Sequence, residues 1–249
     1  MSIGQYLVLF FSVILGGGLA LLLQKHSKTY LQAVLSFGGA YILGIAVLHL
    51  MPLVFTQGGE HIGMYVLLGF FIQLLLEQLS GGVEHGHIHA PPSANTSFAI
   101  QLMLGLCVHS FFEGLPLGSY VEFHGLHHDH HQHDGDHLFY GIILHKAPAA
   151  FALVLLLRKA NYSQAVVYTC LFIFALMSPL GAALGEWGYG GQGFPLEVWM
   201  IVMAMVLGSF LHIATTIIFE IDPSNHHRIS RSKLLAVIAG LGIALLTSH

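Results

Sequence analysis

Two segments of this sequence place ionisable side chains among apolar residues. His109 and Glu113 lie four residues apart in "HSFFEGLPLG", and His145 and Lys146 are adjacent in "HKAPAAFALVLLL". An i, i+4 spacing puts His109 and Glu113 on one face of a helix. Two imidazoles and one carboxylate, with open positions for water, suit a divalent transition metal such as Zn²⁺. These residues therefore predict the exchangeable binding of one metal ion.

The composition indicates the environment of these segments. The chain is 55% hydrophobic and 8% charged, with a mean hydropathy of +0.74, whereas a soluble domain is about 25% charged. Its solvent is therefore expected to be a lipid bilayer, where an ionisable side chain costs several kcal/mol and is usually functional. The net charge of −4 leaves no basic patch for nucleic acid.

Eight segments are long and apolar enough to cross a bilayer as helices, which takes about 20 residues each. They cover residues 3–23, 31–54, 62–80, 97–119, 138–157, 164–185, 197–219 and 233–247. We therefore expect an all-α integral membrane protein with a single polytopic domain, 1–249, and eight transmembrane helices. Every lysine or arginine outside the spans falls in the first, fifth or seventh loop. The positive-inside rule makes these loops cytoplasmic, so both termini are expected to be extracytoplasmic.

Histidine is unusually abundant, with 19 residues against 8 lysines and arginines, and two loops hold much of it. The predicted cytoplasmic loop, 81–96, contains His85, His87 and His89. The predicted external loop, 121–137, contains His124, His127, His128, His130, His131, His133 and His137. Such tracts predict weak capture of metal ions. The alternative is a solvated linker that is merely rich in histidine.

The predicted topology brings the ionisable residues of the two apolar segments to one depth. The fourth span enters from the cytoplasm and the fifth from outside. At 1.5 Å per residue, His109 and Glu113 lie roughly 9–15 Å from the external end and His145 about 10 Å from it. The three side chains can meet if the two helices are neighbours. The alternative is structural, with a histidine hydrogen-bonded between helices and Glu113 paired with Lys146.

The same two segments resemble the fourth-span and fifth-span signatures of the ZIP (Zrt-, Irt-like) metal transporters. Four more segments resemble the family in the same order: "FGGAYILGIAVLHLMP", "GFFIQLLLEQL", "SPLGAALG" and "GSFLHIAT". The resemblance implies a transporter and not an enzyme, without a resident cofactor, in the plasma membrane or an inner membrane. Its substrate would be a divalent metal carried into the cytoplasm, zinc most commonly, with iron and manganese as alternatives. It also implies that His109, Glu113 and His145 are the primary ligands.

Some positions depart from the family pattern or lie beside the ligands. Family members with two metal ions have Asn where this chain has Ser110, and they carry acids at the positions of Lys146 and Ala149. A lysine ammonium repels a cation, so we expect a mononuclear site in which Lys146 pairs with Glu113. His49 matches a recurrent histidine near the outer end of the second span. We assign Ser110, Lys146 and His49 to the surroundings of the ligands or to the pathway of the metal.

The resemblance further implies a moving bundle formed by the first, fourth, fifth and sixth spans, and association as a homodimer. Two other functions compete with metal uptake. An intramembrane zinc-dependent hydrolase would also need a general base and an oxyanion stabiliser, but the spans contain no HExxH motif and offer only Glu77 and Glu186 as spare acids. A metal exporter would use the same ligands, with flux in the opposite direction.

Overall fold

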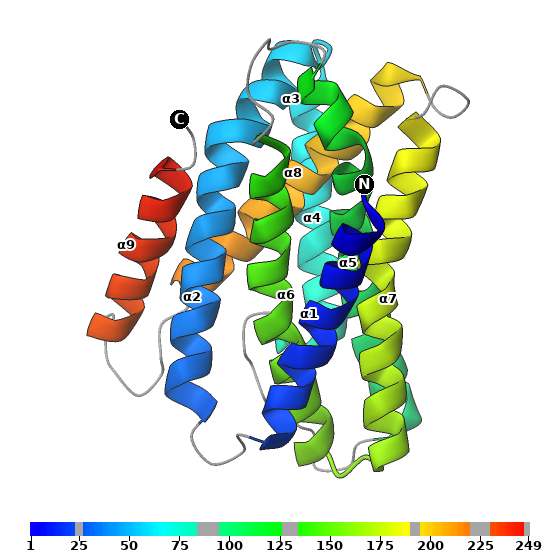
Figure 1. Ribbon diagram of the computed structural model, residues 1–249, viewed down its shortest axis with the longest axis vertical. Coiled ribbons are helices and arrows are strands. Elements are labelled where there is room, and N and C mark those ends of the chain that lie inside the picture. The colour runs from blue at the N-terminus through cyan, green and yellow to red at the C-terminus, as the bar shows by residue number, and fades with distance from the viewer. Residues whose placement is uncertain (23–26, 84–94, 126–133, 190–194, 220–229, 247–249) are drawn as a thin grey trace.

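The computed structural model describes residues 1–22, 27–83, 95–125, 134–189, 195–219 and 230–246 (Figure 1). Within these ranges the chain forms helices and turns and no strand, which confirms the all-α class. The elements are α1 (Ile3–Leu22), α2 (Ser27–Ile45), the π-helical turn η1 (Ala46–Leu50), α3 (Met51–Gln57), α4 (Ile62–Ser80), α5 (Thr96–Gly125), α6 (Asp134–Lys159), α7 (Gln164–Tyr189), α8 (Leu196–Phe219) and α9 (Arg231–Leu246).

Seven helical segments are long and apolar enough to cross a membrane, and the protein is an integral membrane protein. They are Ile3–Leu22, Leu31–Gln57, Ile62–Ser80, Thr96–Gly118, His137–Lys159, Gln164–Gly188 and Leu196–Ile218. The second of these joins α2, η1 and α3 into one segment. The eighth predicted span corresponds to α9, which has only 16 residues. Figure 1 shows the long helices running in alternating directions, with the start of α1 and the end of α9 both in the half of the molecule that contains α3.

The two helices on either side of the predicted histidine-rich loop, 121–137, are longer than the apolar segments that predicted them. Helix α5 continues to Gly125 and α6 begins at Asp134, so both extend into the predicted loop, 121–137. The physical reason is that apolar residues mark only the part of a helix that lies in the bilayer. The helix itself can continue beyond them into polar residues. His137 consequently lies on α6 and not in a loop.

We call α1, α5, α6 and α7 the first bundle and α2, α4, α8 and α9 the second bundle. In the first bundle, α5 packs on α7 and α1 packs on α6 and α7; in the second, α4 packs on α8 and α2 packs on α8 and α9. The two bundles contact each other where α4 packs on α5 and α2 packs on α6. Close approach depends on glycine in both bundles. A Cβ at Gly114 of α5 would lie 2.3 Å from the carbonyl oxygen of Ser178, and one at Gly69 of α4 would lie 2.0 Å from that of Met205. Small residues at such contacts are typical of helix packing in membranes.

Candidate metal centre

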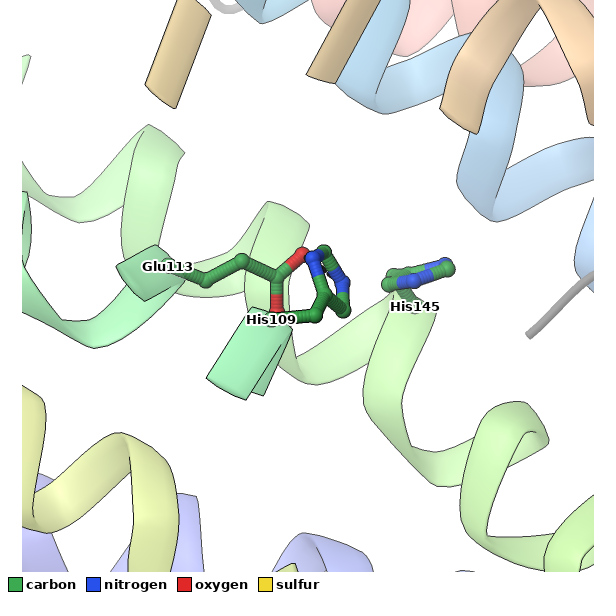
Figure 2. A group of neighbouring side chains, drawn as sticks. All are labelled: His109, Glu113 and His145. Atoms are coloured by element: carbon green, nitrogen blue, oxygen red, sulfur yellow. Dashed lines mark ion pairs between the residues drawn. The ribbon is translucent and has the colours of Figure 1, made fainter. Parts of the chain in front are cut away.

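His109, Glu113 and His145, here called the triad, converge from two helices. Figure 2 shows the first two side chains reaching from α5 toward His145 on α6. One potential ligand atom from each residue lies within 4.8 Å of the others. His109 Nε2 is 3.0 Å from Glu113 Oε1, and the His109 and His145 rings are 6.1 Å apart between centroids. Zinc ligands of these types lie about 2.0–2.2 Å from the ion, so small side-chain rotations would let all three bind one ion.

The triad is buried, with exposed fractions of 2% for His109, 1% for Glu113 and 1% for His145. Ionisable groups are removed from water in this way only when they are paired or bind an ion. The structure thus brings together the three residues that the sequence singled out, at one depth between neighbouring helices. Their role as metal ligands stays a prediction.

Lys146 contacts the triad through the second carboxylate oxygen of Glu113. Its Nζ lies 3.0 Å from Glu113 Oε2, and its exposed fraction is 1%. The ammonium also donates to Ser110 Oγ and, at 3.5 Å, to the Ser110 carbonyl oxygen. It lies 5.4 Å from the centroid of the Phe174 ring. The predicted contact between Lys146 and Glu113 is therefore present.

Ser178 on α7 supports this arrangement, although the sequence analysis did not identify it. Its Oγ lies 3.1 Å from Ser110 Oγ and donates to the Ser110 carbonyl oxygen at 3.0 Å. The contact requires α5 and α7 to approach closely, which Gly114 permits on one helix and Gly181 on the other. The available signal was a serine before Pro179 in the motif "SPLGAALG". Ser178 thereby helps to orient Ser110, which in turn binds Lys146.

Pro148 and Gly38 shape the backbone beside His145. Proline has no N–H, so Pro148 leaves the carbonyl of Leu144, four residues earlier, without its usual helical hydrogen bond. Helix α2 covers this position, because a Cβ at Gly38 would lie 3.1 Å from the Leu144 carbonyl oxygen. A freed carbonyl within a membrane helix must be covered by protein or line a cavity. Glycine on α2 therefore allows the second bundle to pack directly against the segment that carries His145.

The second bundle contributes a polar wall that the sequence analysis also missed. A pocket beside His109 is lined by Gln73 and Ser209 among other residues of α4, α5 and α8. Ser209 Oγ donates to Gln73 Oε1 at 3.1 Å. One turn further along the same two helices, His212 Nε2 contacts Glu77 Oε2. These residues lie in two of the segments that resemble the ZIP family, "GFFIQLLLEQL" and "GSFLHIAT", but only the packing of α4 on α8 shows that they meet.

The two acids considered for a hydrolase have structural contacts of their own. Glu77 contacts His212 of the second bundle. Glu186 accepts a 2.7 Å hydrogen bond from Tyr6 Oη and lies 3.1 Å from the terminal amine of Met1. These contacts join α4 to α8 and α1 to α7, so both acids have structural partners outside the triad.

The remaining predicted metal-binding histidines are only partly described. His49 lies in η1, and its ring centroid is 5.7 Å from that of His137 on α6. The structure therefore separates His137 from the loop histidines with which it was grouped. For His124 the structure describes the backbone but not the side chain. The others lie outside the described residues: His85, His87, His89, His127, His128, His130, His131 and His133.

Comparison with known proteins gives consistent matches. A family model described as "ZIP Zinc transporter" matches residues 84–248, more than half of the chain. Zinc transporter ZIP9 of Micropogonias undulatus is 29% identical over 224 residues, covering 78% of this chain and 69% of the relative. ZIP9-B of Xenopus laevis is 30% identical over 204 residues, covering 76% and 65%. Human ZIP1 is 30% identical over 183 residues, covering 70% and 52%, so the match spans about half of that protein.

Proposed function

This chain belongs to the ZIP zinc transporter family, and from that membership we propose that it carries Zn²⁺ into the cytoplasm through a mononuclear site between α5 and α6. The observation that carries the proposal is the buried triad, in which two imidazoles and one carboxylate come within 4.8 Å of one another. A partly dehydrated ion would exchange water for these ligands. The transported metal is the substrate, and iron or manganese would be alternatives to zinc.

Lys146 gives the proposed site an affinity suited to transport. Its ammonium neutralises the charge of Glu113 before the metal arrives, so the empty site can persist within the membrane. Once Zn²⁺ is bound, the same ammonium repels it at short range through a medium of low dielectric constant. The repulsion favours release, which a transporter needs as much as binding.

Alternating access is proposed to arise between the two bundles. Every residue of the triad lies on α5 or α6, in the first bundle, whereas Gln73 and Ser209 line the pocket beside His109 from the second. Movement of the first bundle relative to the second would carry the intact site past the polar residues Gln73 and Ser209. The first bundle comprises α1, α5, α6 and α7, and the second comprises α2, α4, α8 and α9. We also propose a homodimer, on the basis of the family resemblance.

The proposed topology has eight spans, with α9 as the last and both termini outside. Its support is the alternating direction of the helices (Figure 1), together with Arg158 and Lys159 in the last turn of α6, which the positive-inside rule puts in the cytoplasm. The test uses a chain with Cys107 and Cys170 replaced by Ala. A cysteine introduced within 126–133 should react with an impermeant reagent from outside, and one replacing Arg158 should not. The opposite pattern would invert the topology.

Flux into sealed vesicles tests the proposed function. Purified protein would be reconstituted in an orientation established by the labelling above, with a fluorescent zinc indicator inside the vesicles. In vesicles whose interior faces the cytoplasmic side of the protein, external Zn²⁺ should enter faster with the wild-type chain than with the Glu113→Ala chain. Flux only toward the external face would identify an exporter. Flux equal to that of the Glu113→Ala chain in both directions would contradict transport through this site.

A further inference from the structure

A second pair of histidines lies toward the opposite end of α6 from Arg158. The ring centroids of His49 and His137 are 5.7 Å apart, with 32° between the ring planes. The two imidazoles of the triad have nearly the same separation, 6.1 Å. Both residues of the outer pair are partly accessible, unlike those of the triad, and the Nε2 atom of His49 is buried. The outer pair therefore has the spacing of two ligands for one ion, in two residues that are less buried than the triad.

The local backbone holds the outer pair in position. His49 lies in the π-helical turn η1, where Met51 N–H bonds the carbonyl of Ala46, five residues earlier. Such turns are rare and frequently occur at functional sites. Tyr41 Oη of α2 donates to the carbonyl oxygen of His137 at 3.4 Å, which ties the start of α6 to α2. Both histidines are thus carried by helices that are bonded to each other.

An apolar layer separates the outer pair from the triad. His137 precedes His145 by eight residues of α6, a rise of about 12 Å. Between them, the contact of α2, α6 and α8 encloses an apolar pocket lined by Ile42, Ile45, Leu138, Gly141, Ile142 and Phe210. Its side chains are nearly inaccessible, with exposed fractions of 0–3% for Ile42, Ile45, Leu138, Ile142 and Phe210. Hydrated Zn²⁺ does not cross such a layer unless the helices move.

We propose that His49 and His137 form an outer Zn²⁺ site, which loads the ion before the apolar layer opens toward the triad. Two imidazoles and two waters complete the tetrahedral shell that zinc prefers. This set contains no carboxylate, so it binds more weakly and exchanges faster than the triad. The loading role rests on the proposed function, whereas the binding of zinc at the pair does not.

Equilibrium dialysis with Zn²⁺ tests the site in the full chain. The parent variant carries Ser at His85, His87, His89, His124, His127, His128, His130, His131 and His133, and Ala at His109 and His145. We expect it to bind one Zn²⁺ per chain. His49→Ala or His137→Ala should weaken this binding by at least about tenfold, equivalent to about 1.4 kcal/mol. The control His61→Ala, an exposed histidine before α4, should bind like the parent.

Absence of zinc binding in the parent, or unchanged binding in His49→Ala, would overturn the proposal. Because the parent lacks the two triad histidines, this result is independent of whether the triad transports metal. A second measurement uses a loop-substituted chain, which carries the nine Ser substitutions of the parent but keeps the triad intact. Its zinc flux can be measured even if the parent variant does not fold. There, His49→Ala and His137→Ala should each raise the KM for Zn²⁺ about threefold or more with little change in maximal rate. A lower maximal rate with unchanged KM would overturn the loading role.

Discussion

The two bundles differ in how they hold their polar side chains. In the first, the triad and Lys146 are almost completely buried, and each contact among them lies within α5 and α6. In the second, Gln73 and Ser209 are also buried but line a pocket beside His109, and Glu77 is partly exposed, with 19% of its side chain accessible. The comparison suggests a division of labour. The first bundle would set metal affinity as a unit, and the second would set access to it.

The largest effect is expected from Glu113→Ala. This change removes the anionic ligand and leaves Lys146 as a buried charge without its carboxylate, so zinc flux should be abolished. The stability of the fold should fall by about 3–5 kcal/mol, the usual loss when one member of a buried ion pair is removed. Flux and thermal unfolding would be measured on the same preparations.

A double variant, Glu113→Gln with Lys146→Met, separates the two effects. It should recover most of the unfolding temperature, because no unpaired charge remains, and it should still fail to transport. Wild-type flux in Glu113→Ala would remove the triad from the mechanism.

Loss of one histidine from the triad should have the next largest effect. His109→Ala and His145→Ala should each raise the zinc Kd roughly 10- to 100-fold, or about 1.4–2.8 kcal/mol, and lower flux without preventing folding. His212→Ala in the second bundle serves as the matched control, and its zinc Kd should stay near that of wild type. Unchanged uptake in the His109→Ala/His145→Ala chain would refute the assignment.

Changing Lys146 should alter the number of bound ions. After substitution of the loop histidines, the protein should bind one ion at the affinity of the triad, and the outer pair should fill only at higher zinc. Lys146→Asp should add a second tight ion, because it replaces a repelling charge with a ligand. Lys146→Met, which supplies no carboxylate, should remain at one. Two tight ions with Lys146 intact would contradict the mononuclear site.

Two glycines sharpen the comparison between the bundles. Gly114 lies inside the first bundle against Ser178, so Gly114→Ala should lower the stability of the fold by about 1–3 kcal/mol. Gly105 lies between the bundles, where its Cβ would be 2.6 Å from the carbonyl oxygen of Leu76 on α4. Gly105→Ala should mainly change the transport rate, because the bundles can shift relative to each other. Equal losses of unfolding temperature would argue against separate bundles.

The smallest effect is expected from the histidine-rich loop that is predicted to be external. Replacing its histidines from His124 to His133 with Ser should raise the KM for zinc by roughly two- to fivefold, because the loop only raises the local metal concentration. The maximal rate should change little. The difference should fade at acidic pH, where protonated imidazoles no longer bind metal. Kinetics equal to wild type at every pH would make the tract a solvated linker.

Much of the fold and the candidate site could be predicted because both depend on local pattern. Apolar length located the seven helices that can span a membrane, and i, i+4 spacing with matched depth brought His109, Glu113 and His145 together. The contact of Lys146 with Glu113 could also be predicted, because a charged side chain within a bilayer is costly unless it has a partner of opposite charge. These inferences needed only the residues of single helices and their order in the membrane.

The remaining features depend on packing between helices and could not be predicted. Ser178 and Gln73 lie in segments that resemble the family, but their contacts become visible only when α7 and α4 pack beside α5. His137 was assigned to a loop because polar residues surround it, and η1 beside it has no signature in sequence. Neighbours across helix contacts are set by the fit of whole surfaces, which single-helix patterns do not contain.

X-ray absorption at the zinc edge tests the central claim most directly. The loop-substituted chain, with His49 and His137 also replaced by Ala, would be loaded with one equivalent of Zn²⁺, so that the triad does not compete with the outer pair. We predict only nitrogen and oxygen ligands at about 2.0–2.2 Å, with the outer-shell scattering of two imidazoles. The imidazole signal should fall to one in His145→Ala and should be unchanged in His212→Ala. A spectrum that stays the same in His109→Ala, His145→Ala and Glu113→Ala would contradict the account, because the metal would then be held elsewhere.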